Sequence, residues 1–279
     1  MDIIRETDIL RNRVEILRKE GKRIGFVPTM GYFHEGHLNL MRMSVSDCDV
    51  TIVSNYINPT QFDRQDDLET YPADIERDRA MAEALGVDIM FYPENLYQPD
   101  HKTWVSTEKL TDVLCGRSRP GHFRGVATIV CKLFNIVNPH VTYFGQKDAQ
   151  QAAVIGQMIR DLNYNIQLVL SPIIREPDGL ALSSRNVRLT PEHRKKAPVL
   201  YEKLQIIDKK ILPDLSNKDD LIQEAKKSIE AIPGIRVDYI DIRSWPDLGK
   251  PDHETRHLLI AGAIFMGKVR LIDNIIKEL

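Results

Sequence analysis

The residues of this chain with the clearest chemical potential are two histidines, His34 and His37, with Gly36 between them. They follow an apolar run, Ile24 to Val27, which predicts a buried strand, and they open a segment with helical apolar spacing. A helix N-terminus presents unpaired N–H groups and the positive end of the helix dipole, so it attracts phosphate. Two histidines on one face of that first turn would add donors where a triphosphate lies, and Gly36 would let a flat base or ribose approach.

A zinc site is an alternative use of the same histidines. Zinc would need further ligands at recognisable spacing, whereas Cys48, Cys115 and Cys131 are scattered and form no C-x-x-C pair. A lone pair of histidines is also common on ordinary protein surfaces. The phosphate interpretation therefore depends on the motifs that accompany the pair.

Polar amides follow the next predicted strand, the β-branched run from Val50 to Val53. Asn58 and Gln61 lie in the motif NPTQF, and their side chains can donate and accept hydrogen bonds together. Such groups suit a ligand that carries both hydroxyls and a carboxylate. Taken alone, however, the motif is better explained as a polar turn started by Asn-Pro.

Two further motifs supply positive charge. The segment 116–126 holds three arginines and three glycines, and it could either close over phosphates or form a mobile solvated loop. In YFGQKDAQQ a strand ends, Gly145 makes a turn, and a helix begins near Asp148, either as its cap or beside the site. Lys147 would there place a compact charge near phosphates, and Gln151, one turn onward, would face the same cleft.

A hydroxyl-rich basic triplet, Ser183 to Arg185, lies in the irregular segment 175–186. Alone it would pass for an ordinary loop. It falls where the sequence pattern changes, near Pro177, and a closing lid would be useful at a boundary between domains. We therefore expect this segment and the C-terminal domain, residues 176–279, to act as a lid.

Composition limits the class of protein. The chain has 279 residues, 42% of them hydrophobic and 28% charged, as in a globular protein, and its net charge of −2 gives no basic field for nucleic acid. Three cysteines and no recognisable N-terminal signal predict the cytoplasm. The longest apolar run, 258–267, is too short to span a bilayer and predicts a central strand instead.

The predicted elements divide the chain into two domains. Residues 1–175 alternate strands and helices, which predicts an α/β fold: a Rossmann-like, doubly wound parallel sheet with the histidine loop at the carboxyl end of a strand. Residues 176–279 predict a smaller α+β domain with a hairpin turn at Gly267-Lys268. The expected helices are 72–86, 148–162, 191–211 and 219–232, and the expected later strands are 87–92, 103–106, 141–144, 166–170, 237–244, 256–265 and 269–275.

Five collinear motifs carry a resemblance that covers the whole chain: PTMGYFHEGH, NPTQF, RPGHFRGV, FGQKDAQQ and DGLALSSRN. In this order and at similar spacing they resemble the pantothenate synthetase (pantoate–β-alanine ligase) family, within the nucleotidyltransferase superfamily related to class I aminoacyl-tRNA synthetases. The resemblance implies ATP-dependent condensation of (R)-pantoate with β-alanine through a pantoyl adenylate, with release of pyrophosphate and AMP. It also implies Mg²⁺ and a homodimer. The alternatives are another nucleotidylyltransferase with the same histidine motif, and a non-catalytic ATP-binding sensor on the same fold.

The resemblance also implies roles for individual residues. His37 would be the proton donor, with His34 and Lys147 as further catalytic groups at the phosphates. Asp78 is a possible metal neighbour, the alternative being an exposed helix carboxylate. Pantoate would be held by Gln61, Gln151 and Asn58, with Gln61 also near β-alanine. The ATP site would comprise Met30, Gly31, Tyr32, Phe33, His34, Glu35, Gly36, His37, Gly145, Gln146, Lys147, Asp148, Ile174, Leu182, Ser183, Ser184 and Arg185.

Some positions depart from the family's pattern. Tyr32 and Phe33 replace a small residue and leucine before the first histidine, which would reshape the edge of the ATP pocket. Gln146 stands where glutamate is usual and removes a charge beside Lys147. Leu182 replaces methionine, and Tyr56 stands where phenylalanine is common.

Overall fold

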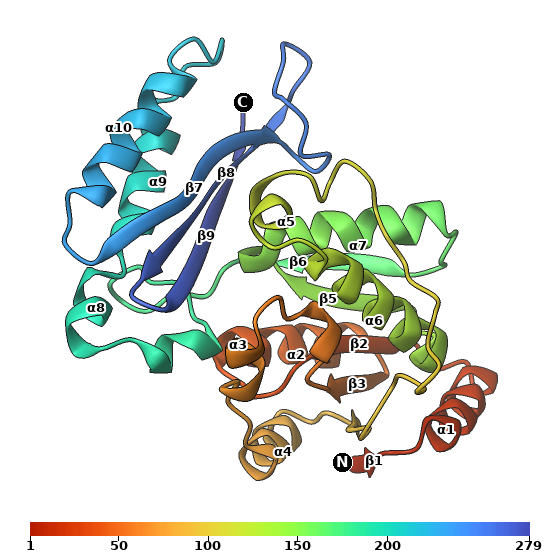
Figure 1. Ribbon diagram of the computed structural model, residues 1–279. Helices are drawn as coiled ribbons and strands as arrows, with labels where there is room; N and C mark the ends of the chain where they lie inside the picture. Colours follow the sequence, from red (N-terminus) through yellow and green to blue (C-terminus); the bar gives the residue numbers. More distant parts are fainter. The chain divides into compact units, whose positions relative to one another are not determined.

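The computed structural model describes residues 1–279, and the chain forms two compact units (Figure 1). The first unit comprises residues 1–107, 119–145 and 154–172, and the second comprises residues 108–118, 146–153 and 173–279. Two internal segments therefore belong with the C-terminal residues, and no sequence pattern predicted them. The expected division at residue 175 stays a prediction.

A six-stranded, wholly parallel sheet forms the centre of the first unit, in the order β1-β4-β3-β2-β5-β6. Every residue of β3 is buried, as expected of a parallel strand covered on both faces. This confirms the predicted α/β class. The strands are β1 (Asp2–Ile4), β2 (Ile24–Thr29), β3 (Val50–Asn55), β4 (Ile89–Phe91), β5 (Val141–Gly145) and β6 (Gln167–Ser171).

Helices cover this sheet by burying apolar stripes. In α1 (Thr7–Lys19) the buried positions are Leu10, Val14 and Leu17, which recur at steps of four and three residues. A Cβ atom on Gly25 of β2 would lie 2.2 Å from the Ser44 hydroxyl of α2, so this glycine lets α2 pack closely on the sheet. The other helical elements are α2 (Glu35–Asp47), η1 (Pro59–Gln61), α3 (Gln65–Glu69), α4 (Ile75–Ala84), α6 (His122–Val137) and α7 (Ala149–Asp161). The first part of α7, residues 149–153, belongs to the second unit.

The order of the strands reverses at β2. Strands β3 and β4 lie on one side of β2, whereas β5 and β6 lie on the other. Ligands of open α/β sheets bind outside the carboxyl ends of the strands at such a switch point. β2 ends at Thr29, so the fold carries the histidine loop to this position.

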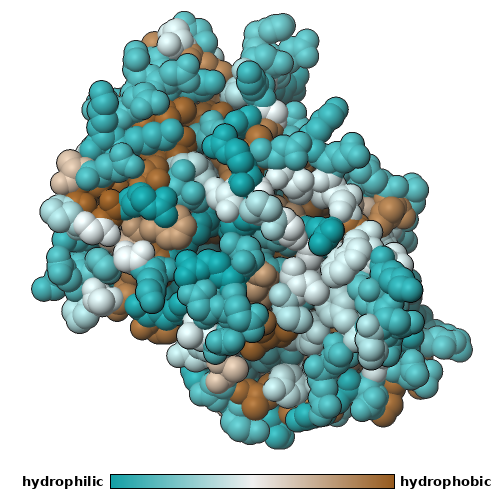
Figure 2. Space-filling view, viewed as in Figure 1, coloured by the Kyte–Doolittle hydropathy of each residue, from teal (hydrophilic) through white to brown (hydrophobic).

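A three-stranded antiparallel sheet, β7-β8-β9, forms the core of the second unit together with α9 and α10. Gly267, with φ of +58°, belongs to the two-residue turn between β8 and β9, which confirms the predicted hairpin. Figure 2 shows a hydrophilic outer face on α10 and hydrophobic side chains along the seam between α10 and β7. The elements are α5 (Leu114–Ser118), η2 (Gln146–Asp148), η3 (Ser184–Arg188), α8 (Pro191–Lys196), α9 (Val199–Lys210), α10 (Lys218–Glu230), β7 (Ile235–Ser244), β8 (His257–Met266) and β9 (Val269–Glu278).

Three expectations about local structure are wrong. Residues 103–106 form no strand. The helix expected over 191–211 is two helices, α8 and α9, because Pro198 has no N–H to continue the first one. The helix expected from residue 72 begins at Ile75, where the Asp74 carboxylate caps the Arg77 N–H. None of the helices combines the length and the apolar character that crossing a membrane requires.

Candidate active site

The two histidines cap α2 reciprocally. The Nδ1 atom of His34 accepts a hydrogen bond from the Gly36 N–H at 3.2 Å, and the Nδ1 atom of His37 accepts one from the His34 N–H at 3.4 Å. The two rings lie 4.1 Å apart between centroids. Because each Nδ1 atom accepts a hydrogen bond from a backbone N–H group, it cannot itself carry a proton, and the neutral ring carries its proton on Nε2. The cap therefore gives each ring an Nε2–H donor at the N-terminus of a helix.

A left-handed turn connects β2 to this cap. Gly31 has φ of +81° and Tyr32 has φ of +52°. A Cβ atom on Gly31 would lie 2.4 Å from the Asn55 amide oxygen, so this position requires glycine for space as well as for conformation. The hydroxyl of Thr29 accepts the Gly31 N–H at 3.1 Å. The chain thereby turns directly from the sheet into the histidine cap.

Asp78 of α4 fixes the same turn from the side. Its two carboxylate oxygens accept the Tyr32 N–H at 2.6 Å and the Phe33 N–H at 2.7 Å, and the Asn55 amide donates to it at 2.9 Å. The Arg77 guanidinium donates to the Phe33 carbonyl at 2.9 Å. Burial raises the pKa of Asp78, and the donors from Phe33, Tyr32 and Asn55 oppose that rise.

The burial of Asp78 bears on its predicted role. Its side chain is fully buried, so the alternative of an exposed helix carboxylate is wrong. Both of its oxygens are engaged by N–H donors of the loop, and the structure gathers no group of three His, Cys, Asp or Glu side chains that could hold a metal ion. The contacts therefore support a role in shaping the loop, whereas the metal role stays a prediction.

The predicted amide pocket is joined to the histidine loop through Gln61. Asn58, at the start of η1, is 1% exposed and donates from Nδ2 to the Gln61 Oε1 atom at 3.0 Å. Gln61 in turn donates from Nε2 toward the Met30 sulfur at 3.0 Å. The structure thus brings together three predicted site residues, one of them in the loop that leads to His34.

The basic segment 116–126 makes ordered contacts with the turn that carries the amides, while its closure over phosphates stays a prediction. The His122 ring binds the Gln61 carbonyl oxygen at 2.7 Å, and Arg119 pairs with Asp63 at 2.7 Å. Burial opposes the shift, but Arg119 holds the pKa of Asp63 below its usual value. These contacts fasten η1 to the first turn of α6, so the interpretation as a mobile solvated loop is wrong for this part of the segment.

In the second unit, Asn274 of β9 supports the predicted phosphate lysine. The Asn274 amide donates to the carbonyl oxygens of Gln146 at 2.9 Å and Lys147 at 3.1 Å. Gln146 donates from its own side chain to the Asn274 amide oxygen at 3.2 Å, which a glutamate could not do. The Lys147 ammonium lies 3.7 Å from the Asp148 carboxylate, and Gln151 is half-buried in α7.

The segment that contains the serine triplet folds back on itself. The Leu182 N–H donates to the Ile174 carbonyl at 3.0 Å, and the Ser183 hydroxyl accepts the Arg185 N–H at 3.3 Å as the cap of η3. Arg175 forms two bonds to Asp273, at 2.6 and 2.8 Å. The predicted residues of this segment therefore lie on one short ordered structure anchored to β9.

Sequence reasoning missed several residues that shape the site, above all Asn55, Asn274 and Tyr97. Asn55 had a signal, because it is a polar residue at the carboxyl end of a buried strand. Asn274 and Tyr97 had none, since each acts on residues that are distant in the sequence.

Comparisons with known proteins agree on the family. The chain matches the family described as pantoate-beta-alanine ligase over residues 2–276. It is 48% identical over 280 residues to the pantothenate synthetase of Caldicellulosiruptor bescii, covering 100% of this chain and 99% of the relative. The crystal structure of the Thermus thermophilus enzyme superposes with a TM-score of 0.87 at 39% identity, covering 99% of both chains. The Francisella tularensis ligase, solved with beta-gamma ATP and beta-alanine, gives a TM-score of 0.81 at 34% identity, covering 99% of this chain and 97% of that one.

Proposed function

The chain belongs to the pantoate–β-alanine ligase family, and from that premise we propose a route for its reaction. It is a ligase that condenses pantoate with β-alanine, with ATP as the third substrate. The match over the full length of enzymes with this activity favours ligation over nucleotide transfer alone and over a sensor without turnover.

The proposed reaction has two steps, because a carboxylate is a poor acylating agent. A pantoate carboxylate oxygen attacks the α-phosphorus of ATP, the bond to the β-phosphate breaks, and pyrophosphate leaves. The β-alanine amine then attacks the acyl carbon of the pantoyl adenylate, an amide bond forms, AMP leaves, and the amine releases a proton. The tasks of the protein are positioning and stabilisation of the charge that moves onto the leaving groups.

The reciprocal histidine cap is the observation that carries this proposal. It supports Nε2–H donation from both rings at a helix N-terminus, where the helix dipole also favours negative charge. We assign His37 as the donor to the leaving pyrophosphate and His34 as its companion at the phosphates. Lys147 and the triplet from Ser183 to Arg185 are assigned to phosphate on the family resemblance, as are the other predicted ATP contacts.

Pantoate is assigned to the amides of Gln61 and Gln151, with Asn58 behind Gln61. The bond from Asn58 to the Gln61 oxygen supports this role, since it leaves the Gln61 nitrogen to donate toward a carboxylate or hydroxyl.

Mg²⁺ is proposed to arrive on ATP, held mainly by phosphate oxygens, because the protein itself gathers no cluster of metal-binding side chains. A cytoplasmic homodimer completes the proposal. The three cysteines of the chain form no disulfide, which is consistent with a reducing compartment.

The test is a substrate-omission experiment on the wild-type protein. With Mg²⁺ and all three substrates we expect AMP, pyrophosphate and pantothenate in equal amounts, and no AMP release without pantoate. Release of pyrophosphate with transfer of the adenylyl group, but without any release of AMP that depends on β-alanine, would support the nucleotidylyltransferase alternative. Binding of ATP without any pantoate-dependent turnover would support the sensor.

A further inference from the structure

The segment 92–107 of the first unit contains no helix or strand, yet aromatic contacts fix it in place. The Tyr97 ring meets the His101 ring edge-to-face at 4.9 Å and lies stacked on Trp104 at 6.3 Å between centroids. His101 and Trp104 contact each other edge-to-face at 5.0 Å. Such ring pairs stabilise a loop beyond the area that they bury.

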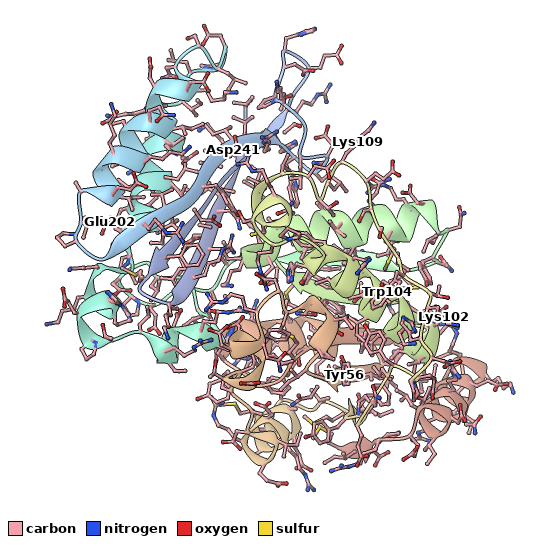
Figure 3. All side chains as sticks on the ribbon, in the orientation of Figure 1. Tyr56, Lys102, Trp104, Lys109, Glu202 and Asp241 are labelled. Atoms are coloured by element: carbon pink, nitrogen blue, oxygen red, sulfur yellow. The ribbon has the colours of Figure 1, made fainter.

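This aromatic cluster of Tyr97, His101 and Trp104 is attached to α6. The Arg124 guanidinium lies 4.8 Å from the centre of the Trp104 ring, and the Lys132 ammonium lies 5.3 Å from that of Tyr97. Figure 3 shows Trp104 beside α6. The position of Tyr97 is therefore set from several directions without any regular backbone structure.

The Tyr97 hydroxyl reaches the turn that carries the candidate pantoate amides. It donates to the Asn58 Oδ1 atom at 3.0 Å, and it lies 3.0 Å from the Thr60 hydroxyl, which donates to the same Oδ1 atom at 2.9 Å. Burial raises the pKa of Tyr97 to about 12, so the phenol keeps its proton at neutral pH. Asn58 is 1% exposed, and its carbonyl end is thus committed to hydroxyl donors in a buried place.

The orientation of one amide determines that of the next. Because the Asn58 oxygen faces Tyr97, its nitrogen donates to the Gly125 carbonyl at 3.2 Å and to the Gln61 oxygen at 3.0 Å. The Gln61 nitrogen must then point away from Asn58, and it meets the Met30 sulfur. A thioether is a weak acceptor, so a carboxylate or hydroxyl oxygen of a ligand can take its place at little cost.

We propose that Tyr97 is a positioning residue for pantoate, acting through Asn58 to present the Gln61 N–H₂ group rather than its oxygen to the substrate. The inference rests on the proposed function of Gln61. It adds a residue that contacts no substrate. That residue orients the Gln61 amide through two successive hydrogen bonds, from Tyr97 to Asn58 and from Asn58 to Gln61.

The test removes one oxygen atom. Tyr97→Phe keeps the aromatic cluster but leaves Asn58 without its phenol donor, and loss of one neutral hydrogen bond predicts a fall of about threefold to tenfold in kcat/KM for pantoate. The KM for ATP should stay at its wild-type value, and the thermal midpoint of unfolding should fall by no more than a few degrees, since only one hydrogen bond is lost. Tyr92→Phe, at the start of the same segment, is the matched control and should leave all of these parameters unchanged.

A double variant shows whether the effect passes through Gln61. In a Gln61→Ala background, which lacks the amide to be oriented, Tyr97→Phe should cause no further loss of kcat/KM for pantoate. Equal losses for pantoate and ATP, or losses that multiply in the double variant, would overturn the inference while the wild-type reaction stands. A wild-type protein without pantoate-dependent turnover would overturn the proposed function, and this inference with it.

Discussion

Asp78 provides a sharp test of how the histidine loop is held. Asp78→Asn keeps the size of the side chain but replaces one acceptor oxygen with an N–H₂ group. That group must face the N–H of either Tyr32 or Phe33, which now bind the two carboxylate oxygens at 2.6 and 2.7 Å. One buried backbone donor is then left without an acceptor, at a cost of about 1–3 kcal/mol. Tyr32 has a φ of +52°, a left-handed conformation that is unfavourable for a residue with a side chain, so a weaker hydrogen bond there also makes the loop easier to open.

The assay is amide hydrogen exchange across residues 28–37, together with turnover. A loss of about 1–3 kcal/mol in the free energy of loop opening predicts exchange about 5- to 150-fold faster at Tyr32 and Phe33. The value of kcat/KM for ATP should fall in parallel, because the loop positions the histidine cap. Asp74→Asn is the matched control: it removes the same charge from the same helix and retains a good N-cap, so exchange and turnover should stay as in the wild type.

Two results would refute this reasoning. Unchanged protection at Tyr32 and Phe33 in Asp78→Asn would show that the carboxylate does not hold the loop. Activity restored by excess Mg²⁺, with the loop amides still protected, would assign Asp78 to the metal instead.

Two further predictions concern stability. Burial and two neighbouring arginines lower the pKa of His140, so below about pH 6.5 the unfolded chain binds more protons than the folded one. The free energy of unfolding should therefore decrease as the pH is lowered through this range. His140→Asn retains an acceptor for the Ile24 N–H and should make this decrease smaller in urea titrations at about pH 5.5 and 7.5. In Gly125→Ala the new Cβ atom would lie 2.4 Å from the Thr60 carbonyl oxygen, so the free energy of unfolding should fall by about 1–3 kcal/mol although alanine favours helix; a thermal midpoint equal to that of wild type would contradict this.

The parts of the fold predicted correctly are those with strong local patterns. The buried run at Val50 and the hairpin turn at Gly267 are defined by neighbouring residues, and the position of the histidine loop follows from a general rule about parallel sheets. The missed helix α1 also had a readable stripe, Leu10, Val14 and Leu17. The expected strand at 103–106 failed because ring contacts and not a strand ladder fix that segment.

What the sequence could not provide is the set of long-range hydrogen bonds behind the site. The bond from Tyr32 to Asp78 spans 46 positions, and the one from Tyr97 to Asn58 spans 39. Local spacing marks neither pairing, since buried polar groups are satisfied by whichever element the fold brings near. The residues proposed to carry the chemistry are named by motifs, whereas the hydrogen bonds that orient them could be read only from the fold.

The central claim is that the His37 Nε2–H serves the leaving pyrophosphate, and pantoate-dependent exchange of labelled pyrophosphate into ATP, without β-alanine, measures that step alone. His37→Asn keeps an acceptor at the Nδ1 position, where the His34 N–H binds at 3.4 Å, and removes the Nε2 donor. Loss of one such donor predicts exchange slower by about 10²- to 10³-fold. His253→Asn, at a histidine whose side chain is 90% exposed, should exchange at the wild-type rate. Exchange by His37→Asn within a few-fold of wild type, with the protein folded, would contradict the account.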